Sequence, residues 1–378
     1  MQTGTVFHPL GLDRARMLEL MAEQGLAGIL LTSPENVFYT SGYTALPSSG
    51  NPILYTLRNR LPFGTYIDEQ GRVALLCWAF SAQGVDFGAD EIVGFDDLAG
   101  AHEAFQSVVG DRLASGGTLG VESTCPRWVL ELLTSGAGDP ALGSADGVLS
   151  ELRLIKSDEE VALIAASTEL IERTVGELFD VLKPAGSRVA LMREAKERLY
   201  RHGADGISHV TFSFATENPE VEIDESFDPG RLATLDLGAI VGGYCSDNRR
   251  YAYCGEIPAT LQARYQTMVE IVDEVGAALK PGTPYAELQQ LGVDLFERNG
   301  IELLKRFTHV GHNIGLETEE EWIDDRPDRS IKAGMVINIE LYSHAETGEQ
   351  IGNEETYVVQ GDGPRRLSVL PREIRSIA

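Results

Sequence analysis

Two carboxylate residues stand inside strongly apolar runs, and they constrain the fold more than any other feature of the sequence. Asp236 lies within residues 235–239 (LDLGA), and Glu340 ends residues 334–340 (GMVINIE). An ionised carboxylate buried in a core strand is costly unless a cation or a hydrogen-bond donor compensates its charge. We therefore expect a fold that brings a cation or a hydrogen-bonding partner to both positions.

Three further strings of the second half carry polar residues among apolar and glycine residues. Residues 243–247 (GYCSD) end in Asp247, His312 lies within residues 309–315 (HVGHNIG), and Glu354 lies within residues 352–356 (GNEET). A glycine-rich turn separates Asp236 from Asp247. In a hairpin, the strand register can bring these two carboxylates to one face of the sheet.

Four carboxylates and one imidazole that converge would form a cation site. Oxygen-rich ligands with a single histidine suit Mn²⁺, Co²⁺, Fe²⁺ or Zn²⁺, and two ions can share bridging carboxylates. Two ions about 3.5–4 Å apart activate a water molecule and polarise a carbonyl together. Taken alone, each acid also fits a solvated or salt-bridged structural residue, and His312 fits a hydrogen-bonded core histidine. The joint pattern favours the metal site.

Composition excludes several other classes of function. The chain has 31 Lys and Arg against 58 Asp and Glu, a net charge of −27, and such a surface repels nucleic acid and anionic lipid. No window approaches the roughly 18 apolar residues of a membrane span, and residues 1–11 lack the features of a secretory signal. The four cysteines form no Cys-x-x-Cys pair. We interpret the chain as a cytoplasmic protein with buried free thiols.

The first 150 residues alternate helix and strand signals, which predicts an α/β layer. The predicted helices are residues 12–24 and 128–133. The predicted strands are residues 26–31, 73–78 and 118–121. Residues 41–64 are rich in Ser, Pro, Asn and Gly, and we interpret them as a long loop.

A domain boundary is predicted near residue 150, after the Gly-, Ala- and Asp-rich residues 135–147. Ser157 and Glu160 form a capping-box pattern that opens a long helix. The later predicted helices are residues 189–202, 260–279 and 284–299, with short strands from residue 207. The glycine pairs lack the strand–GxGxxG–helix context, which excludes a dinucleotide site.

The four strings resemble those of the pita-bread metalloenzymes, which include methionine aminopeptidase, Xaa-Pro aminopeptidase, prolidase and the metal-free creatinase. The resemblance extends to residues 152–157 (LRLIKS) and 367–373 (LSVLPRE), and residues 28–36 (GILLTSPEN) look like the creatinase-type N-terminal domain. It implies an α+β chain. A creatinase-type α/β N-terminal domain would span residues 1–150, and a pita-bread catalytic domain residues 151–378.

The resemblance also implies a role for each ligand position. Asp236 matches a ligand of one metal ion, and His312 and Glu340 match ligands of the second. Asp247 and Glu354 match the bridging carboxylates. These five residues imply two divalent ions (Mn, Co, Zn or Fe) and separate the chain from creatinase, whose ligand set is degenerate.

The activity implied by the resemblance is that of a metallohydrolase, an Xaa-Pro dipeptidase or aminopeptidase. A metal-bound hydroxide would attack an amide carbonyl, with Glu340 as general base and later proton donor. The substrate would be a small peptide or small amide, and the family usually forms homodimers.

Two histidines of the family's peptidases are missing. Glu319 stands where the histidine after His312 is expected, and residues 216–228 contain no histidine. Those histidines hold the substrate carbonyl, so their loss weakens the peptidase interpretation. His209 and His309 are the candidate replacements, unless they are ordinary polar residues near strand ends.

Arg249 is a further departure, because the family's Asp-x-Thr-Arg pattern is DNRR in residues 247–250. Strand alternation predicts that Arg249 faces the same side as Asp247 and that Arg250 faces away. Its partner would be a substrate carboxylate or Glu319.

Trp322 follows the missing histidine and resembles non-peptidase relatives. The alternative function is therefore a pita-bread enzyme that acts on a small C–N metabolite, as in creatinase- or ectoine-hydrolase-like relatives. The five intact ligand positions disfavour a non-catalytic binding module.

Overall fold

The structure is a computed structural model that describes residues 5–7, 9–113, 116–134, 140–214, 221–304, 308–345 and 348–378. The chain separates into two compact units, Met1–Arg153 and Leu154–Ala378. The division falls within the helix α6 (Asp146–Leu154). Among the described residues, no helix combines the length and the apolar character needed to cross a membrane.

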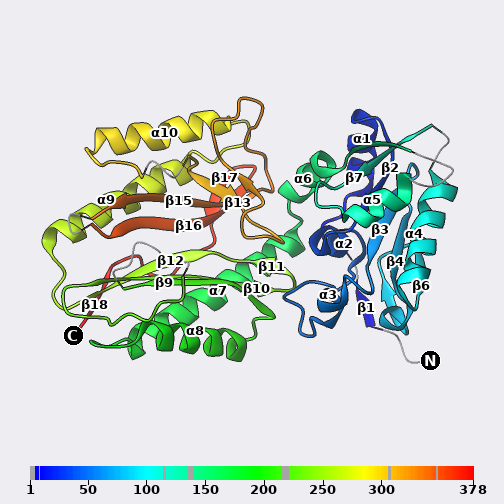
Figure 1. The fold of residues 1–378 in the computed structure, drawn as a ribbon. Helices are drawn as coiled ribbons and strands as arrows, with labels where there is room; N and C mark the ends of the chain where they lie inside the picture. The colour runs from blue at the N-terminus through cyan, green and yellow to red at the C-terminus, as the bar shows by residue number, and fades with distance from the viewer. Residues whose placement is uncertain are drawn as a thin grey trace. The chain divides into compact units, whose positions relative to one another are not determined.

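The first unit is built on a mixed six-stranded sheet with the strand order β6-β4-β3-β2-β7-β8 (Figure 1). Its strands are β2 (Leu26–Leu31), β3 (Gly64–Asp68), β4 (Val73–Trp78), β6 (Glu91–Phe95), β7 (Thr118–Val121) and β8 (Ala141–Ser144). Its helices are α1 (Arg14–Glu23), α2 (Pro34–Ser41), α3 (Ile53–Leu57), α4 (Leu98–Arg112) and α5 (Arg127–Thr134), with the 3₁₀ turn η1 (Ala79–Ala82). The short strands β1 (Thr5–Phe7) and β5 (Val85–Phe87) pair separately.

The predicted helices and strands of this unit are confirmed, but the predicted loop over residues 41–64 is wrong in part. It contains the helix α3, and Tyr43, Ala45 and Leu46 are buried. These apolar residues anchor a segment whose Ser, Pro, Asn and Gly content suggested a solvated loop.

The second unit holds two five-stranded sheets. The first sheet contains β9 (Gly206–Ser213), β10 (Leu232–Val241), β11 (Tyr244–Cys245), β12 (Asn248–Cys254) and β18 (Arg375–Ile377). The second sheet contains β13 (Gly311–Asn313), β14 (Glu321–Trp322), β15 (Val336–His344), β16 (Gln350–Gln360) and β17 (Gly363–Arg366). Together with the first unit, this confirms the predicted α+β class.

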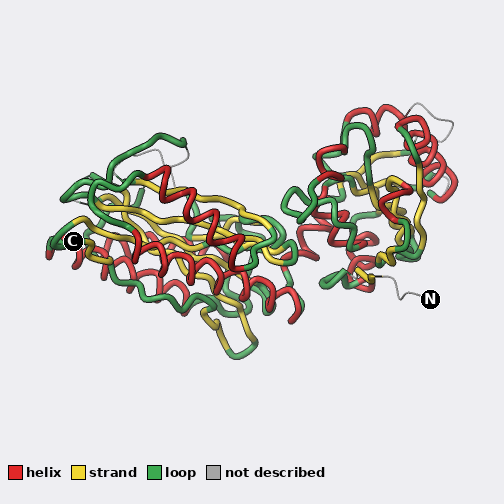
Figure 2. Tube along the Cα trace, turned by 90° about the horizontal axis from the view of Figure 1, so that it is seen from below, coloured by secondary structure: helices red, strands yellow, loops and turns green. Residues whose placement is uncertain are grey.

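Four helices cover the outer faces of these two sheets (Figure 1), and Figure 2 shows the same layers from below. They are α7 (Asp158–Val181) and α8 (Arg188–His202) on the first sheet, and α9 (Ala259–Ala277) and α10 (Tyr285–Arg298) on the second. Helix α7 begins as predicted, since the Ser157 hydroxyl accepts from the Glu160 N–H while the Glu160 carboxylate accepts from the Ser157 N–H. Each sheet forms a separate apolar core with its helices, and a smaller apolar cluster joins the two sheets, so part of the inner faces is left for polar groups.

A two-residue turn joins β10 to β11 and reverses the chain. Val241 pairs with Tyr244, and the intervening Gly242 and Gly243 have φ values of 57° and 90°. A two-residue hairpin turn of this kind requires positive φ at both positions, which glycine supplies at low cost. The predicted glycine-rich hairpin between the two aspartates is therefore confirmed.

Candidate metal centre

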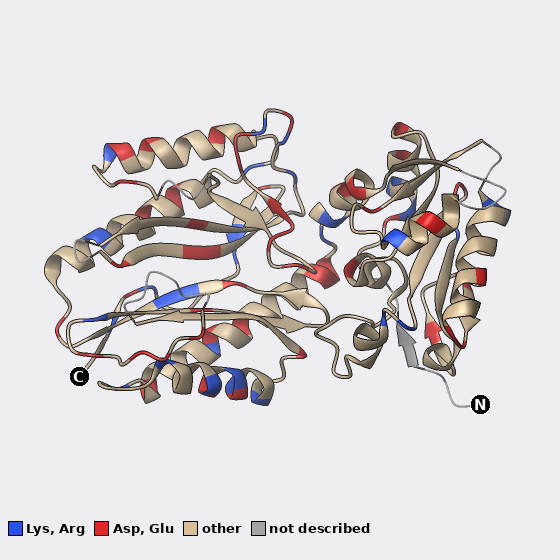
Figure 3. Ribbon diagram, viewed as in Figure 1, with Lys and Arg blue, Asp and Glu red and all other residues tan. Residues whose placement is uncertain are grey.

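The candidate residues lie on the facing sides of the two sheets of the second unit. Figure 3 shows acidic positions on β15 and β16 and a basic stretch on β12 of the opposite sheet. On the first sheet, His209 on β9 contacts both aspartates. Its Nε2 lies 3.1 Å from Oδ1 of Asp236 and 3.2 Å from Oδ1 of Asp247. The hairpin thus brings both carboxylates to one imidazole.

Gly238 makes room for this imidazole. It pairs with His209 across β9 and β10. A Cβ atom at position 238 would lie 2.7 Å from Cε1 of His209 and 2.3 Å from the carbonyl oxygen of Ser246. Real Cβ contacts are longer than this, so glycine is needed for the close approach.

Arg249 faces the same side as Asp247, as strand alternation predicts, but its partner is Asp236. The two residues are paired directly across β10 and β12. The Arg249 Nε donates to Oδ2 of Asp236 at 3.0 Å, and Nη2 donates to the same oxygen. The expected Arg249–Glu319 pair is wrong, because the Glu319 carboxylate accepts from the indole Nε1 of Trp322 at 2.7 Å.

Arg250 points away from the candidate centre, as predicted. Its guanidinium lies 3.0 Å from Oε1 of Glu355 and donates to three backbone carbonyl oxygens. Ser368 also donates to Glu355. These two buried residues form an ion pair on the opposite side of the strands, so we assign them a structural role.

The second sheet contributes His312, Glu340 and Glu354. Glu340 and Glu354 are directly opposite on the antiparallel strands β15 and β16, where two like charges repel. The His312 Nε2 lies 3.9 Å from Glu340 and 3.7 Å from Oδ2 of Asp247. Asp247 therefore connects the groups of the two sheets.

His309 lies beside Glu340, with its Nε2 3.2 Å from the carboxylate. Its ring stacks on Trp322 at 4.9 Å between centroids and 17° between planes, and the indole is 46% exposed. Both candidate histidines therefore reach carboxylates of the centre, His209 at Asp236 and His309 at Glu340.

Sequence reasoning missed two residues of the centre, Asn338 and Tyr342. The Asn338 Nδ2 donates to Oε1 of Glu354 at 2.6 Å, and the Tyr342 hydroxyl donates to Oε2 of Glu340 at 2.7 Å. Both stand two residues from Glu340 on β15, so alternation along a strand was the signal that places all three on one face.

The electrostatic environments of the carboxylates differ. Burial raises the pKa of Asp236, but Arg249 and His209 outweigh it and lower the pKa to about 2. Burial also raises the pKa of Glu340, but His309 and His312 outweigh it and lower the pKa to about 2. The pKa of Glu354 rises well above its ordinary value because of burial and of the neighbouring carboxylates. Glu354 is therefore the carboxylate with too little positive charge beside it.

The residues present fit a divalent metal ion. There are two groups in which each residue offers one ligand atom and these atoms lie within 4.8 Å of one another: His209, Asp236 and Asp247 form one, and Asp247, His312 and Glu354 form the other. In the second group, Oε2 of Glu354 is buried and has no hydrogen-bond partner among the described residues. A carboxylate oxygen left open beside an imidazole and a second carboxylate suits ions of the Mn, Co, Zn or Fe class.

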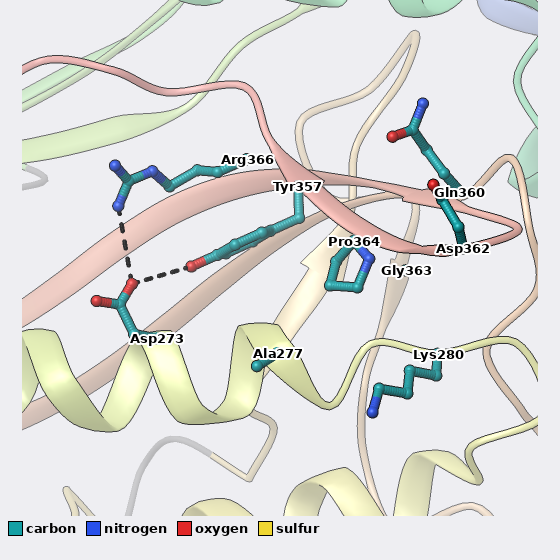
Figure 4. A pocket seen from close by; sticks show the side chains of 9 residues that line it. All are labelled: Asp273, Ala277, Lys280, Tyr357, Gln360, Asp362, Gly363, Pro364 and Arg366. Carbon is teal, nitrogen blue, oxygen red and sulfur yellow. Dashed lines mark hydrogen bonds and ion pairs between the residues drawn. The ribbon is translucent and has the colours of Figure 1, made fainter.

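A separate surface hollow of about 670 Å³ lies between α9 and the hairpin of β16 and β17 (Figure 4). It is lined by Asp273, Ala277, Lys280, Tyr357, Gln360, Asp362, Gly363, Pro364 and Arg366. Asp273 lies 3.7 Å from Arg366 and 3.5 Å from the Tyr357 hydroxyl. None of the candidate metal-centre residues lines this hollow, so the chemistry described above is not located there.

Two family profiles match the chain. Residues 14–155 match the Creatinase/Prolidase N-terminal domain, and residues 162–361 match metallopeptidase family M24. An Xaa-Pro dipeptidase of Pyrococcus horikoshii is 24% identical over 368 residues, which cover 95% of this chain and 97% of that protein.

Solved structures share the fold. The prolidase of Pyrococcus horikoshii OT3 has a TM-score of 0.80 at 20% identity, over 96% of this chain and 99% of that one. The Xaa-Pro dipeptidase of Bacillus anthracis has a TM-score of 0.81 at 22% identity, over 96% and 99%. Together with the family profiles, these likenesses confirm the resemblance inferred from the sequence strings.

Proposed function

The chain belongs to metallopeptidase family M24, and from this premise we propose that it is a metal-dependent Xaa-Pro peptidase acting on small peptides. The observation that carries the proposal is the buried cluster of Asp247, His312, Glu340 and Glu354, with one Glu354 oxygen open. The names of its relatives, an Xaa-Pro dipeptidase and a prolidase, support the substrate class.

These four residues would hold a divalent ion of the Mn, Co, Zn or Fe class. When bound, such an ion polarises a carbonyl and activates a water molecule. The resemblance implies two ions. A second ion on Asp236 requires that this carboxylate exchange its bonds to Arg249 and His209 for metal.

Glu340 is the proposed general base and later proton donor. Its carboxylate is fixed from two sides, by His309 at 3.2 Å and by the Tyr342 hydroxyl at 2.7 Å. A carboxylate held in this way can take a proton from water and return it to the leaving amine without reorienting.

His309 and His209 are proposed to replace the missing family histidines. Each carries an imidazole beside a carboxylate of the centre, and an imidazole N–H can stabilise negative charge on a substrate carbonyl oxygen. Trp322 and Glu319 are proposed substrate contacts, because the exposed indole lies on His309 and donates to Glu319. Arg249 is a proposed substrate contact only if a substrate carboxylate displaces Asp236.

The substrate class is tested with a panel of Xaa-Pro dipeptides, matched dipeptides without proline, and small amides and amidines. We expect the Mn²⁺-loaded protein to hydrolyse several Xaa-Pro dipeptides, and the Glu354→Gln variant to be inactive on all of them. Turnover of amides or amidines without turnover of any Xaa-Pro dipeptide would reject the proposal in favour of a small C–N metabolite.

We also propose that the protein acts in the cytoplasm as a homodimer. All four cysteines carry free, buried thiols, as is usual in reducing compartments. The dimer is implied by the family resemblance. Sedimentation at several concentrations would give the mass of two chains if the proposal holds, and of one chain if it fails.

A further inference from the structure

We propose that Arg249 takes the place of one of the two divalent ions, so that this chain binds a single ion, held by Asp247, His312, Glu340 and Glu354. The inference rests on the proposed function, since it concerns the same centre. The inference reduces the number of ions from the two implied by the resemblance to one, and it assigns Arg249 a positioning role.

The first argument is that both oxygens of Asp236 are already occupied. Oδ1 is hydrogen-bonded to His209 at 3.1 Å, and Oδ2 accepts from both Nε and Nη2 of Arg249. By contrast, Oε2 of Glu354 has no hydrogen-bond partner among the described residues. Hydrogen bonds from the protein therefore occupy both oxygens of Asp236 and leave one oxygen of Glu354 available to a metal ion.

The second argument is that the Arg249 guanidinium is held in place by its surroundings. Strand pairing sets it directly opposite Asp236. Its Cζ lies 4.3 Å from the centroid of the Tyr342 ring, which adds a cation–π contact. Its Nε also lies 3.9 Å from Oε2 of Glu354, so the cation reaches carboxylates of both sheets. A planar guanidinium suits this arrangement better than a mobile ammonium group.

The test is the number of Mn²⁺ ions bound per chain, measured by equilibrium dialysis with elemental analysis. The variants are Arg249→Thr, which restores the residue type of the family pattern, and Arg249→Lys, which keeps the positive charge. We expect one ion in the wild type, two in Arg249→Thr and one in Arg249→Lys. Electron paramagnetic resonance should show an isolated Mn²⁺ ion in the wild type and an exchange-coupled pair in Arg249→Thr.

Asp236→Asn and Glu354→Gln provide a second comparison, with circular dichroism to confirm folding. The inference predicts that Asp236→Asn retains one ion and that Glu354→Gln loses it. Two ions per wild-type chain, with one lost in Asp236→Asn, would overturn the inference and leave the peptidase proposal standing. Conversely, one bound ion without Xaa-Pro turnover would reject the peptidase proposal and support the single-ion inference.

Discussion

Glu340 and Glu354 are paired across β15 and β16, yet their carboxylates have different surroundings. Glu340 is hydrogen-bonded to His309 and Tyr342, and its pKa is low despite its burial. Glu354 accepts from Asn338 on one oxygen and has the other open among the described residues. We infer that Glu340 is held ionised in a fixed orientation and that Glu354 needs a metal ion.

Tyr342→Phe removes one hydrogen bond from Glu340 and keeps the ring that lies on Arg249. Losing a partner that orients a ligand typically costs about 10–100-fold in metal affinity or activity. We expect a loss in this range, measured as Mn²⁺ affinity and as kcat/KM on an Xaa-Pro dipeptide. The control is Tyr357→Phe, whose hydroxyl contacts Asp273 away from the centre. Equal effects of the two changes would contradict the role of Tyr342.

The partner of Arg249 shows what the sequence analysis left out. Alternation along the strand correctly predicted the side that Arg249 faces, but it names no partner across the sheet. The partner follows from the two-residue turn at Gly242 and Gly243, because the pairing of Val241 with Tyr244 continues without a slip to the pair of Asp236 and Arg249. The sequence analysis did not predict that this turn has two residues, so it could not identify Asp236 as the partner.

At the scale of elements, the hairpin of β10 and β11 positions the first half of the centre. Gly243 has φ of 90°, where a side chain is strained. Gly243→Ala should destabilise the protein by about 1–2 kcal/mol, measured by denaturant unfolding, and should weaken Mn²⁺ binding by displacing Asp247. Gly110→Ala in α4 is the control, since a Cβ there meets open space and alanine favours the helix. An unchanged stability and Mn²⁺ affinity in Gly243→Ala would show that the turn does not set the register.

Helices α7 and α8 are joined by Glu177, which accepts from Arg198 at 2.8 Å and contacts His202 at 2.9 Å. The hydrogen bonds from His202 and Arg198 lower its pKa to about 2. A lowered folded-state pKa contributes stability above the unfolded value of about 4.3, and this contribution disappears as pH falls toward 2.

We therefore expect Glu177→Gln to lower the midpoint of thermal unfolding at pH 7. The corresponding loss in free energy of unfolding should be below about 1 kcal/mol. The difference between variant and wild type should shrink steadily from about pH 4 to pH 2. The matched change Glu197→Gln removes an exposed pair with Arg201 within α8 alone. A gap between Glu177→Gln and wild type that stays constant down to pH 2 would contradict this assignment.

Helices were predicted correctly where a local sequence signal marks them. The prediction failed where burial against distant residues determines the structure. The capping box at Ser157 and Glu160 is a local signal and gave the correct start of α7. In residues 41–64, whose composition resembles a loop, Tyr43, Ala45 and Leu46 are buried, and the Tyr43 ring packs on Phe87 of β5. Such contacts are not visible in a single sequence.

At the scale of the whole molecule, the sequence strings were sufficient to predict the α+β class and the family. They also named five candidate ligand positions, whose side chains the structure brings into one cluster. The resemblance implied two ions, whereas the single-ion proposal rests on the hydrogen bonds of Asp236 to Arg249 and His209, which the sequence strings do not reveal. The assignment of the chemistry to the unit Leu154–Ala378 follows from the position of these residues.

The most direct test of the account is turnover of an Xaa-Pro dipeptide as a function of Mn²⁺ bound to metal-free protein. The account predicts no turnover without metal and a rate that rises in proportion to bound Mn²⁺ until the sites are filled. It also predicts that Glu354→Gln stays inactive at every Mn²⁺ concentration. Full turnover by protein shown to be metal-free by elemental analysis would contradict it.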